Sequence, residues 1–257
     1  MEPAVIPIDD RGFLLGDGLF ETVLFKAGRP VLWEAHMARL TRGCLAIGLP
    51  PPDARRLEAE ARRAVADRRL GSARAAVRLT WTAGSGGRGL GRPEPPTPRL
   101  VASAAASPRP DGPATVVVSK IRRNARSPSA RLKSLGYLDN VLARREAEAA
   151  GADEALMLNT AGHAASAAAA NLFWITDGRL HTPSLACGVL DGIMRAQVMA
   201  AAPVEEVRAS LDTLLQAEAA FLTNSLIGIR TIRLLAGRFL QPHPIIGQLN
   251  AGLEALF

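Results

Sequence analysis

The pattern of hydrophobic and polar residues in the first third of the chain predicts strands that alternate with helices. Residues 20–28 and 29–36 predict two short strands that turn at Ala27-Gly28. In residues 74–84 apolar and polar residues alternate with the two-residue period of a strand, which predicts a third strand. Two more extended runs flank a Pro- and Gly-rich turn cluster at 107–113. This region therefore combines short strands with well-marked turns.

Between and after these strands, apolar residues recur at the three- and four-residue spacing of helices. This spacing predicts helices over 36–49, around 57–71 and over 134–151, where Gly151 marks the end of the third. The expected apolar faces consist of Met37, Leu40, Cys44 and Leu45 in the first helix and Leu135, Leu138, Val141 and Leu142 in the third. Asp191 is the expected N-cap of a further helix that begins GIMRAQ.

The turn cluster at 107–113 is also the best candidate for a domain boundary. We place a first domain at 1–110 and a second at 111–257. The chain of 257 residues is 48% hydrophobic and 21% charged, which is typical of a globular protein with room for a sizeable core.

Charge and cysteine content narrow the function classes. The net charge of +7 comes from dispersed arginines, and only 4% of the residues are aromatic, so we expect no nucleic-acid partner. No apolar stretch is long enough for a membrane span, and the N-terminus lacks the pattern of a secretory signal. Cys44 and Cys187 lie far apart, which disfavours disulfides and metal sites. We therefore expect a cytoplasmic protein without a metal.

The chain holds only three lysines, Lys26, Lys120 and Lys133, whereas the other 28 of its 31 basic Lys and Arg positions are arginine. An arginine cannot act as an amine nucleophile, because its guanidinium does not lose its proton at working pH. Each lysine is therefore either an ordinary surface residue or a candidate nucleophile.

Residues 84–89 read GSGGRG and follow a predicted strand, as in a dinucleotide-binding fingerprint. That fingerprint also needs a helix directly afterwards, and the next residues, LGRPEPPTP, exclude one. The stretch is therefore either a mobile surface turn or a glycine-rich loop whose Arg88 closes on an anionic ligand.

Three segments together resemble one known family. They are DRGFLLGDGLFETVLFKAGRPVLWEAHMARL at 10–40, KSLGYLDN at 133–140 and ANLFW at 170–174. In order and spacing they are similar to the fold-type IV pyridoxal-phosphate enzymes, the class-IV aminotransferase family. The resemblance implies a two-domain α/β (α+β) protein with a small N-terminal α/β domain and a larger C-terminal domain that contains a barrel-like sheet. It also implies pyridoxal 5'-phosphate between the domains and a homodimer.

The resemblance assigns roles to particular residues. Lys133 matches the lysine that binds the cofactor covalently and moves protons during the reaction. The cofactor's phosphate is expected to contact Arg39 and two loops, whose residues are Ile193, Met194, Ser225 and Leu226. Tyr137, taken to be one helical turn from Lys133, is expected near the ring hydroxyl. Asn171 is expected to make a structural or substrate-side hydrogen bond.

One position departs from the family pattern. Most members have a glutamate that pairs with the pyridine nitrogen, and this chain has Ser166 there, with no carboxylate in the stretch HAASAAAAN. A serine does not hold the nitrogen protonated, so the cofactor becomes a weaker electron sink.

Finer features, including GSGGRG and GVLDGIMR, are similar to the lyases of this family. Those enzymes convert 4-amino-4-deoxychorismate, a small anionic substrate, to 4-aminobenzoate and pyruvate for folate synthesis. The product ring is aromatic, so this reaction needs less electron withdrawal than transamination does. Thr22 and Arg88 are weaker substrate-side candidates. The alternatives are a D-amino-acid or branched-chain amino-acid aminotransferase, and a relative that has lost catalysis.

Overall fold

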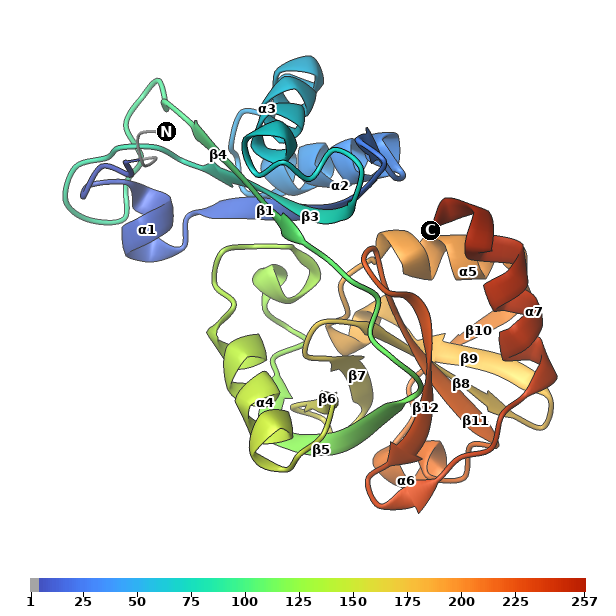
Figure 1. The fold of residues 1–257 in the computed structure, drawn as a ribbon. Coiled ribbons are helices and arrows are strands. Elements are labelled where there is room, and N and C mark those ends of the chain that lie inside the picture. The colour runs from blue at the N-terminus through green and yellow to red at the C-terminus, as the bar shows by residue number, and fades with distance from the viewer. Residues whose placement is uncertain (1–4) are drawn as a thin grey trace. The chain divides into compact units, whose positions relative to one another are not determined.

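A computed structural model describes residues 5–257 (Figure 1). The chain folds into two compact units. Unit 1 contains the chain up to Pro108 together with the short segment Leu132–Gly136, and unit 2 contains Arg109–Arg131 and Tyr137–Phe257. The division after Pro108 falls in the predicted turn cluster. A single cut of the sequence does not describe the units, however, because the five residues around Lys133 belong to unit 1.

Unit 1 is an antiparallel sheet with helices packed against it. Its elements are α1 (Arg11–Leu15), β1 (Gly18–Lys26), β2 (Arg29–Pro30), α2 (Trp33–Ala46), α3 (Ala54–Asp67), β3 (Arg74–Thr82) and β4 (Arg99–Ala106). The strand order is β2-β1-β3-β4. Helices α2 and α3 lie on the same face of this sheet (Figure 1). Their apolar side chains and those of β1 and β3 form one core.

The predicted helices and strands of unit 1 are mostly confirmed. Helix α2 buries Met37, Leu40 and Cys44, whereas Leu45 is exposed. The prediction of a strand over 29–36 is wrong beyond its first two residues, because α2 already begins at Trp33. Leu32 precedes this helix with a φ of 53°, so the chain bends sharply there instead of remaining extended.

The segment Leu132–Gly136 runs beside β1 within unit 1. The backbone N–H of Phe20 donates to the carbonyl of Lys133 over 2.9 Å, and that of Leu135 donates to the carbonyl of Gly18 over 3.1 Å. Leu19 and Ser134 form a β-bridge. Lys133 therefore lies in a non-helical segment paired with β1, and the helix predicted from residue 134 does not begin there.

Helix α4 (Leu138–Ala149) begins four residues later than predicted. Leu138 and Val141, placed on its apolar face by the sequence pattern, are 68% and 51% exposed. The helix instead buries Ala143 and Ala147 against neighbouring side chains of unit 2. Small side chains let a helix approach its neighbours closely, and a pattern of large apolar residues does not reveal such a face.

Unit 2 is built on a mixed nine-stranded sheet. Its strands are β5 (Ala114–Arg123), β6 (Glu154–Asn159), β7 (Ala164–Ala167), β8 (Asn171–Thr176), β9 (Arg179–Pro183), β10 (Val204–Val207), β11 (Ala219–Asn224), β12 (Gly228–Leu235) and β13 (Arg238–Phe239). The order is β10-β9-β8-β11-β12-β5-β6-β7, with β13 paired to β12. The sheet curls so that β7 also approaches β8, which gives the expected barrel-like form (Figure 1).

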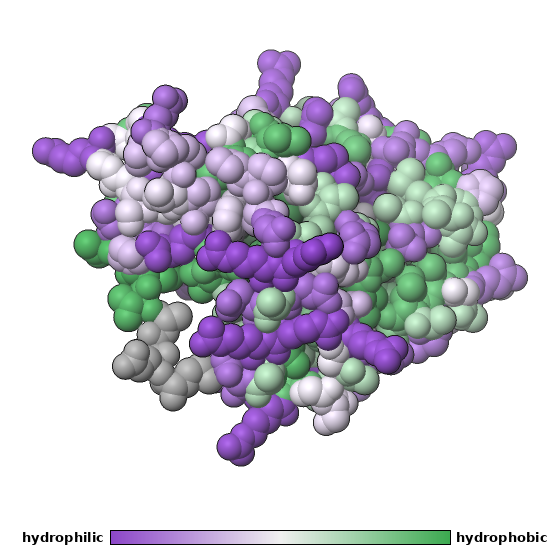
Figure 2. Space-filling view, turned by 90° about the horizontal axis from the view of Figure 1, so that it is seen from above, coloured by the Kyte–Doolittle hydropathy of each residue, from purple (hydrophilic) through white to green (hydrophobic). Residues whose placement is uncertain are grey.

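Helices surround this curled sheet. They are α4, α5 (Ile193–Ala201), α6 (Leu211–Leu214), α7 (Pro244–Leu253) and the short turns η1 (Pro128–Arg131), η2 (Leu185–Cys187) and η3 (Glu254–Leu256). Hydrophilic side chains project from the face in Figure 2, with apolar areas between and beside them. Within residues 5–257 no helix has the length and apolar character that crossing a membrane requires.

Candidate active site

Lys133 stands apart from the other two lysines in its surroundings. Lys26 and Lys120 are exposed, whereas Lys133 is half-buried in unit 1. Its Nζ lies 4.2 Å from the centroid of the Phe20 ring, which is itself buried. A cation this close to an aromatic face is attracted by the ring, and the ring also excludes water from the amine.

A buried carboxylate lies in the same unit. Glu21 of β1 accepts hydrogen bonds from both Nε (2.8 Å) and Nη2 (2.6 Å) of Arg39. The Nδ1 of His36 lies 2.7 Å from the second oxygen of this carboxylate. His36 and Arg39 are three residues apart on α2, so both side chains leave the same face of the helix toward β1. Arg39 is therefore an ion-paired, mostly buried side chain, not an exposed helical charge.

The charges in this cluster determine its protonation. Burial by itself raises the pKa of Glu21, but the Arg39 charge and the bonds from Arg39 and His36 lower it to about 2. For Lys133, burial and the Arg39 and Arg78 cations lower the pKa to about 8, against the opposing effect of Glu21. An amine with this pKa is partly neutral near pH 8, as a nucleophile or proton acceptor must be.

Arg78 is a site residue that the sequence did not single out. Its guanidinium carbon lies 3.6 Å from the centroid of Phe20, the ring that also contacts Lys133. On the sheet Arg78 pairs with Thr22, one of the predicted substrate-side residues. The sequence does not distinguish Arg78 from the other arginines of the chain, because its place beside Phe20 and Thr22 follows from the pairing of β1 with β3.

In unit 2, two asparagines connect three turns. Asn171 begins β8, and its side-chain amide donates to the carbonyl of Leu190 over 3.0 Å. Asn224 ends β11, and its side-chain amide donates to the carbonyl of Ala169 over 2.9 Å. Because Asn171 pairs with Thr223 on the neighbouring strand, the turns near 169, 191 and 225 meet at one end of the sheet.

Helix α5 presents its N-terminus at this place. Its N-cap is Gly192, one residue after the predicted Asp191, and no side chain caps the helix. The first-turn N–H groups of Ile193 and Met194 are thus suited to an anion. A Cβ at Gly192 would lie 1.9 Å from Oδ1 of Asn171, so only glycine fits here.

The second predicted phosphate loop follows β11. Ser225 and Leu226 are half-buried, and the N–H groups of Leu226 and Ile227 both donate to Oδ1 of Asn224 over 2.9 Å. Among the described residues, the buried hydroxyl of Thr223 has no hydrogen-bond partner. The Thr223 hydroxyl and the uncapped N-terminus of α5 are suited to bind a phosphate group. The Leu226 N–H already donates to Asn224 and is not available for this.

The two remaining cofactor candidates also lie in unit 2. Tyr137 is the half-buried N-cap residue of α4. Because α4 begins after Tyr137 and Lys133 lies in the segment beside β1, the two residues are not one helical turn apart, and that prediction is wrong. Ser166 is buried in β7, opposite Met157 of β6.

A buried carboxylate that the sequence did not predict contacts the turn that follows β7. The carboxylate of Glu154, buried on β6, accepts from the N–H groups of Ala155 (3.0 Å) and Ala169 (3.3 Å). Burial raises the pKa of this carboxyl group.

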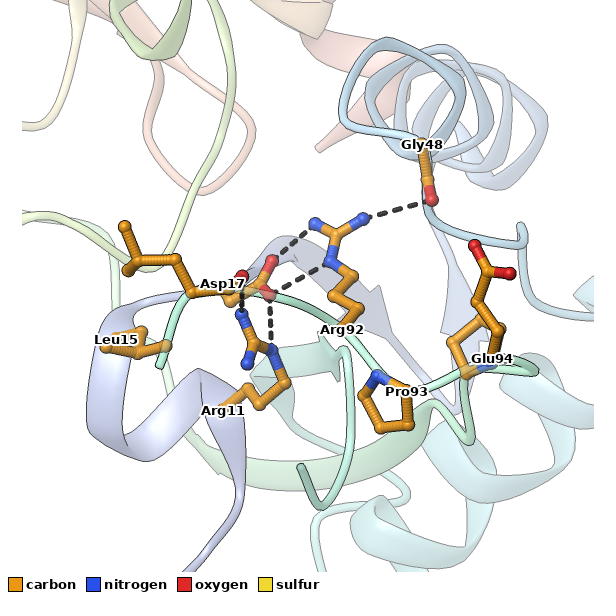
Figure 3. Close-up of a pocket in the computed structure, with 9 residues that line it drawn as sticks. Arg11, Leu15, Asp17, Gly48, Arg92, Pro93 and Glu94 are labelled. Carbon is orange, nitrogen blue, oxygen red and sulfur yellow. Dashed lines mark hydrogen bonds and ion pairs between the residues drawn. The ribbon is translucent and has the colours of Figure 1, made fainter. Parts of the chain in front are cut away.

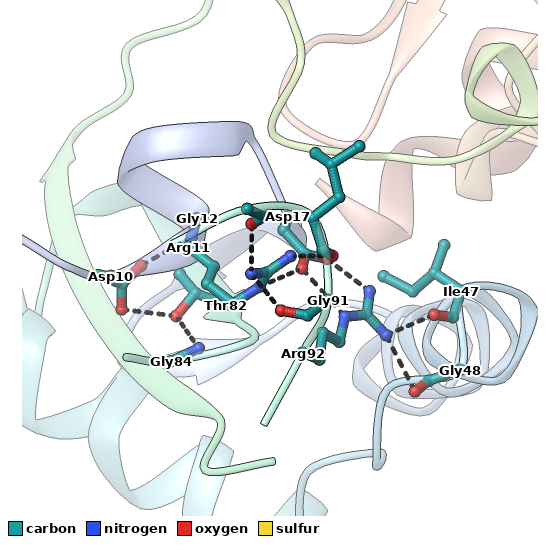
Figure 4. A network of polar contacts seen from close by, with 12 residues as sticks. Asp10, Arg11, Gly12, Asp17, Ile47, Gly48, Thr82, Gly84, Gly91 and Arg92 are labelled. Atoms are coloured by element: carbon teal, nitrogen blue, oxygen red, sulfur yellow. Dashed lines mark hydrogen bonds and ion pairs between the residues drawn. The ribbon is translucent and has the colours of Figure 1, made fainter. Parts of the chain in front are cut away.

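The glycine-rich loop has no helix, which confirms that it is not a dinucleotide fingerprint. Its later part is anchored inside unit 1. The guanidinium of buried Arg11 donates to the carbonyls of Gly89 (3.3 Å), Leu90 (2.8 Å) and Gly91 (2.9 Å) and, through Nε, to Asp17 (2.9 Å). Arg92 approaches Asp17 from the other side (Figure 4). Arg88, before this anchored part, is exposed.

A cavity of about 690 Å³ opens beside this network. Figure 3 shows Arg11, Asp17 and Arg92 joined to one another on its wall, with Pro93 and Glu94 nearby. The guanidinium nitrogens of Arg92 contact Asp17 and the carbonyls of Ile47 and Gly48. Both arginines are therefore engaged in holding the loop.

Comparisons to known proteins identify the family. The chain belongs to the amino-transferase class IV family, whose model matches residues 18–235. It is 33% identical to the aminodeoxychorismate lyase of Bacillus subtilis over 88% of this chain and 80% of that protein. The crystal structure of 4-amino-4-deoxychorismate lyase from Pseudomonas aeruginosa matches with a TM-score of 0.87 and 32% identity, covering 99% of this chain and 96% of that one.

Aminotransferases of the same family are similar as well. The D-alanine aminotransferase of Listeria monocytogenes serotype 4b is 28% identical over 92% of this chain and 84% of that protein. The comparisons therefore identify an enzyme of class IV, within which both lyases and aminotransferases occur.

Proposed function

We propose that this protein is a pyridoxal-phosphate-dependent lyase that converts 4-amino-4-deoxychorismate to 4-aminobenzoate and pyruvate. The observation that carries the proposal is Lys133, the one half-buried lysine of the chain, with a pKa of about 8 beside the Phe20 ring. The similarity to lyases from two bacteria supports the choice of reaction.

Different residues of the chain would hold different parts of the cofactor. Lys133 would bind its aldehyde carbon. The candidates to hold its phosphate are Arg39 in unit 1 and, in unit 2, the N–H groups of Ile193 and Met194 with the Thr223 and Ser225 hydroxyls. When bound, pyridoxal phosphate withdraws electrons from the carbon that bears the substrate's amine. Ser166, in place of a carboxylate, makes this withdrawal weaker.

Lys133 would also move the protons. Its amine takes the proton from the ring carbon that bears the amino group and returns one to the departing enolpyruvate, which becomes pyruvate. Loss of that proton and of the enolpyruvyl group makes the ring aromatic, so aromatisation supplies much of the driving force. The two carboxylates of this substrate require cations, and Arg78 with Thr22 on the adjoining strands is the best-placed pair in unit 1.

The second candidate is an aminotransferase for D- or branched-chain amino acids. It is favoured by the similarity to D-alanine aminotransferase. It is disfavoured by Ser166, because transamination needs a stronger electron sink than a neutral pyridine offers.

The test is borohydride reduction of the purified protein with added pyridoxal phosphate, followed by peptide mass mapping. We expect the phosphopyridoxyl mass on the Lys133 peptide, its loss in Lys133→Ala and its retention in the control Lys120→Ala. The wild-type protein should then form 4-aminobenzoate from 4-amino-4-deoxychorismate. Formation of a 2-oxo acid from amino acids, without 4-aminobenzoate, would select the aminotransferase instead.

A further inference from the structure

Glu21 is the least exposed charged side chain in contact with the proposed cofactor residues. It is 1% exposed, yet it remains ionised because Arg39 and His36 hydrogen bond to both of its oxygens. A buried carboxylate costs several kcal/mol unless its partners compensate it closely, so its presence needs a reason.

We propose that Glu21, held in place by His36, is a positioning residue that fixes the Arg39 guanidinium and balances the positive charge beside Lys133. This inference rests on the proposed function for the identity of the cofactor. The contacts themselves belong entirely to unit 1. Glu21 acts through its neighbours and has no direct part in the chemistry.

The first half of the proposal follows from the geometry of the ion pair. Two parallel bonds of 2.8 and 2.6 Å join the Nε and Nη2 edge of Arg39 to the two oxygens of Glu21. Such a bidentate pair fixes the plane of the guanidinium as well as its distance. An arginine fixed in advance loses less side-chain entropy when it binds a phosphate, so binding is stronger.

The second half follows from the charges. Lys133 lies beside β1, where its carbonyl accepts from the N–H of Phe20, the residue before Glu21. Lys133 and Arg78 both lie over the Phe20 ring, and Arg39 is bonded to Glu21, so three cations gather around this part of β1. Arg39 and Arg78 favour the neutral amine of Lys133, and the carboxylate of Glu21 favours its charged form. Without Glu21, the proton on Lys133 would be held less tightly.

His36 completes the arrangement without adding a charge. Its imidazole is buried, and burial lowers its pKa, so the ring is neutral at working pH. Because an ionised Glu21 can only accept, Nδ1 must carry the proton. Nε2 is then a buried acceptor, and it has no hydrogen-bond partner among the described residues. A lysine or arginine here would add a further cation beside Lys133.

The test measures the protonation of Lys133 directly in the protein without added cofactor. The rate at which acetic anhydride labels the Lys133 peptide is followed against pH by mass spectrometry. In the parent protein the apparent pKa should be about 8. We expect it to fall in Glu21→Gln, to rise in Arg39→Gln and to stay unchanged in Glu34→Gln, a matched control on an exposed residue of α2.

Glu21→Asp is the second variant, in case Glu21→Gln does not fold. It keeps the charge but is too short for both Arg39 bonds. We expect little change in the Lys133 pKa and pyridoxal-phosphate binding about tenfold to a hundredfold weaker, from the loss of one charged hydrogen bond. An unchanged Lys133 pKa in Glu21→Gln, or unchanged affinity in Glu21→Asp, overturns the inference.

The two measurements separate this inference from the proposed function. If Lys133 shows these pKa changes but no variant or parent binds pyridoxal phosphate, the charge balance stands and the proposed function fails. If the parent binds the cofactor and the Lys133 pKa is the same in Glu21→Gln as in the parent, the proposed function stands and this inference fails.

Discussion

Ser166 is the single residue on which the choice of reaction depends most. It is buried in β7, where most relatives are expected to carry a carboxylate. Replacement of Ser166 by glutamate should strengthen the electron sink and shift the protein toward transamination. We expect Ser166→Glu to release 2-oxo acid from D- or branched-chain amino acids and to form 4-aminobenzoate more slowly. Chromatography of both products checks this.

Ser129→Glu is the matched control, because it makes the same substitution at an exposed residue of η1. It should leave both product rates as in the parent. Thermal unfolding of each variant separates a change of reaction from loss of fold. A Ser166→Glu protein that folds, keeps its full lyase rate and gains no 2-oxo acid would refute the role given to Ser166.

Among the elements of unit 1, the glycine-rich loop depends most on one side chain. Asp17 forms ion pairs with both Arg11 and Arg92. The two guanidinium groups lower the pKa of Asp17, and Arg92 makes the largest contribution. Asp17→Asn leaves Arg11 buried beside a neutral group. We expect the free energy of unfolding to fall by about 3 kcal/mol and hydrogen exchange to become faster at residues 89–92.

Asp67→Asn makes the same change in an exposed ion pair on α3, where the nearest contact to Arg63 is 3.9 Å. Such a pair contributes at most about 1 kcal/mol to the free energy of unfolding, so the urea midpoint of Asp67→Asn should stay close to that of the parent. Equal effects of the two substitutions would mean that Asp17 does not anchor the loop.

For the molecule as a whole, acid should be strongly destabilising. The pKa of Glu21 lies near 2, below its ordinary 4.5, so its ionised form stabilises the fold above about pH 4.5 and this contribution is lost as the pH falls toward 2. Asp17 and Asp153 shift in the same direction. We expect the urea midpoint to fall between pH 6 and pH 3. A midpoint that stays constant over this range would contradict these ion pairs.

An exposed apolar surface favours the expected homodimer. Phe13 and Leu14 of α1 are 64% and 56% exposed, and Leu90 of the nearby loop is 84% exposed, which is unusual unless a partner covers them. We propose that this surface of unit 1 contacts a second copy. Light scattering should give about twice 27.1 kDa for the parent and a smaller mass for Phe13→Asp. Phe239→Asp, at a 69% exposed phenylalanine of unit 2, is the control. A monomeric parent would contradict the proposal.

Local patterns in the sequence were sufficient to predict most helices and strands of unit 1. Helices α2 and α3 and strands β1 and β3 were predicted from the spacing of apolar residues, because each buries one face or both faces of a regular element. The pattern failed at α4, whose buried face is alanine, and at Leu32, where one residue of positive φ turns a predicted strand into a helix start. Neither feature leaves a periodic signal.

Residue types and their order along the chain were enough to predict the family and to single out Lys133, whereas the boundary placed after residue 110 missed that Leu132–Gly136 belong to unit 1. The tertiary structure alone decided which groups surround that lysine. Glu21, Arg78 and Lys133 are separated by more than fifty residues from one another in the chain, and strand pairing in unit 1 brings them into one electrostatic cluster. A pKa depends on distance and burial in space, and sequence separation specifies neither.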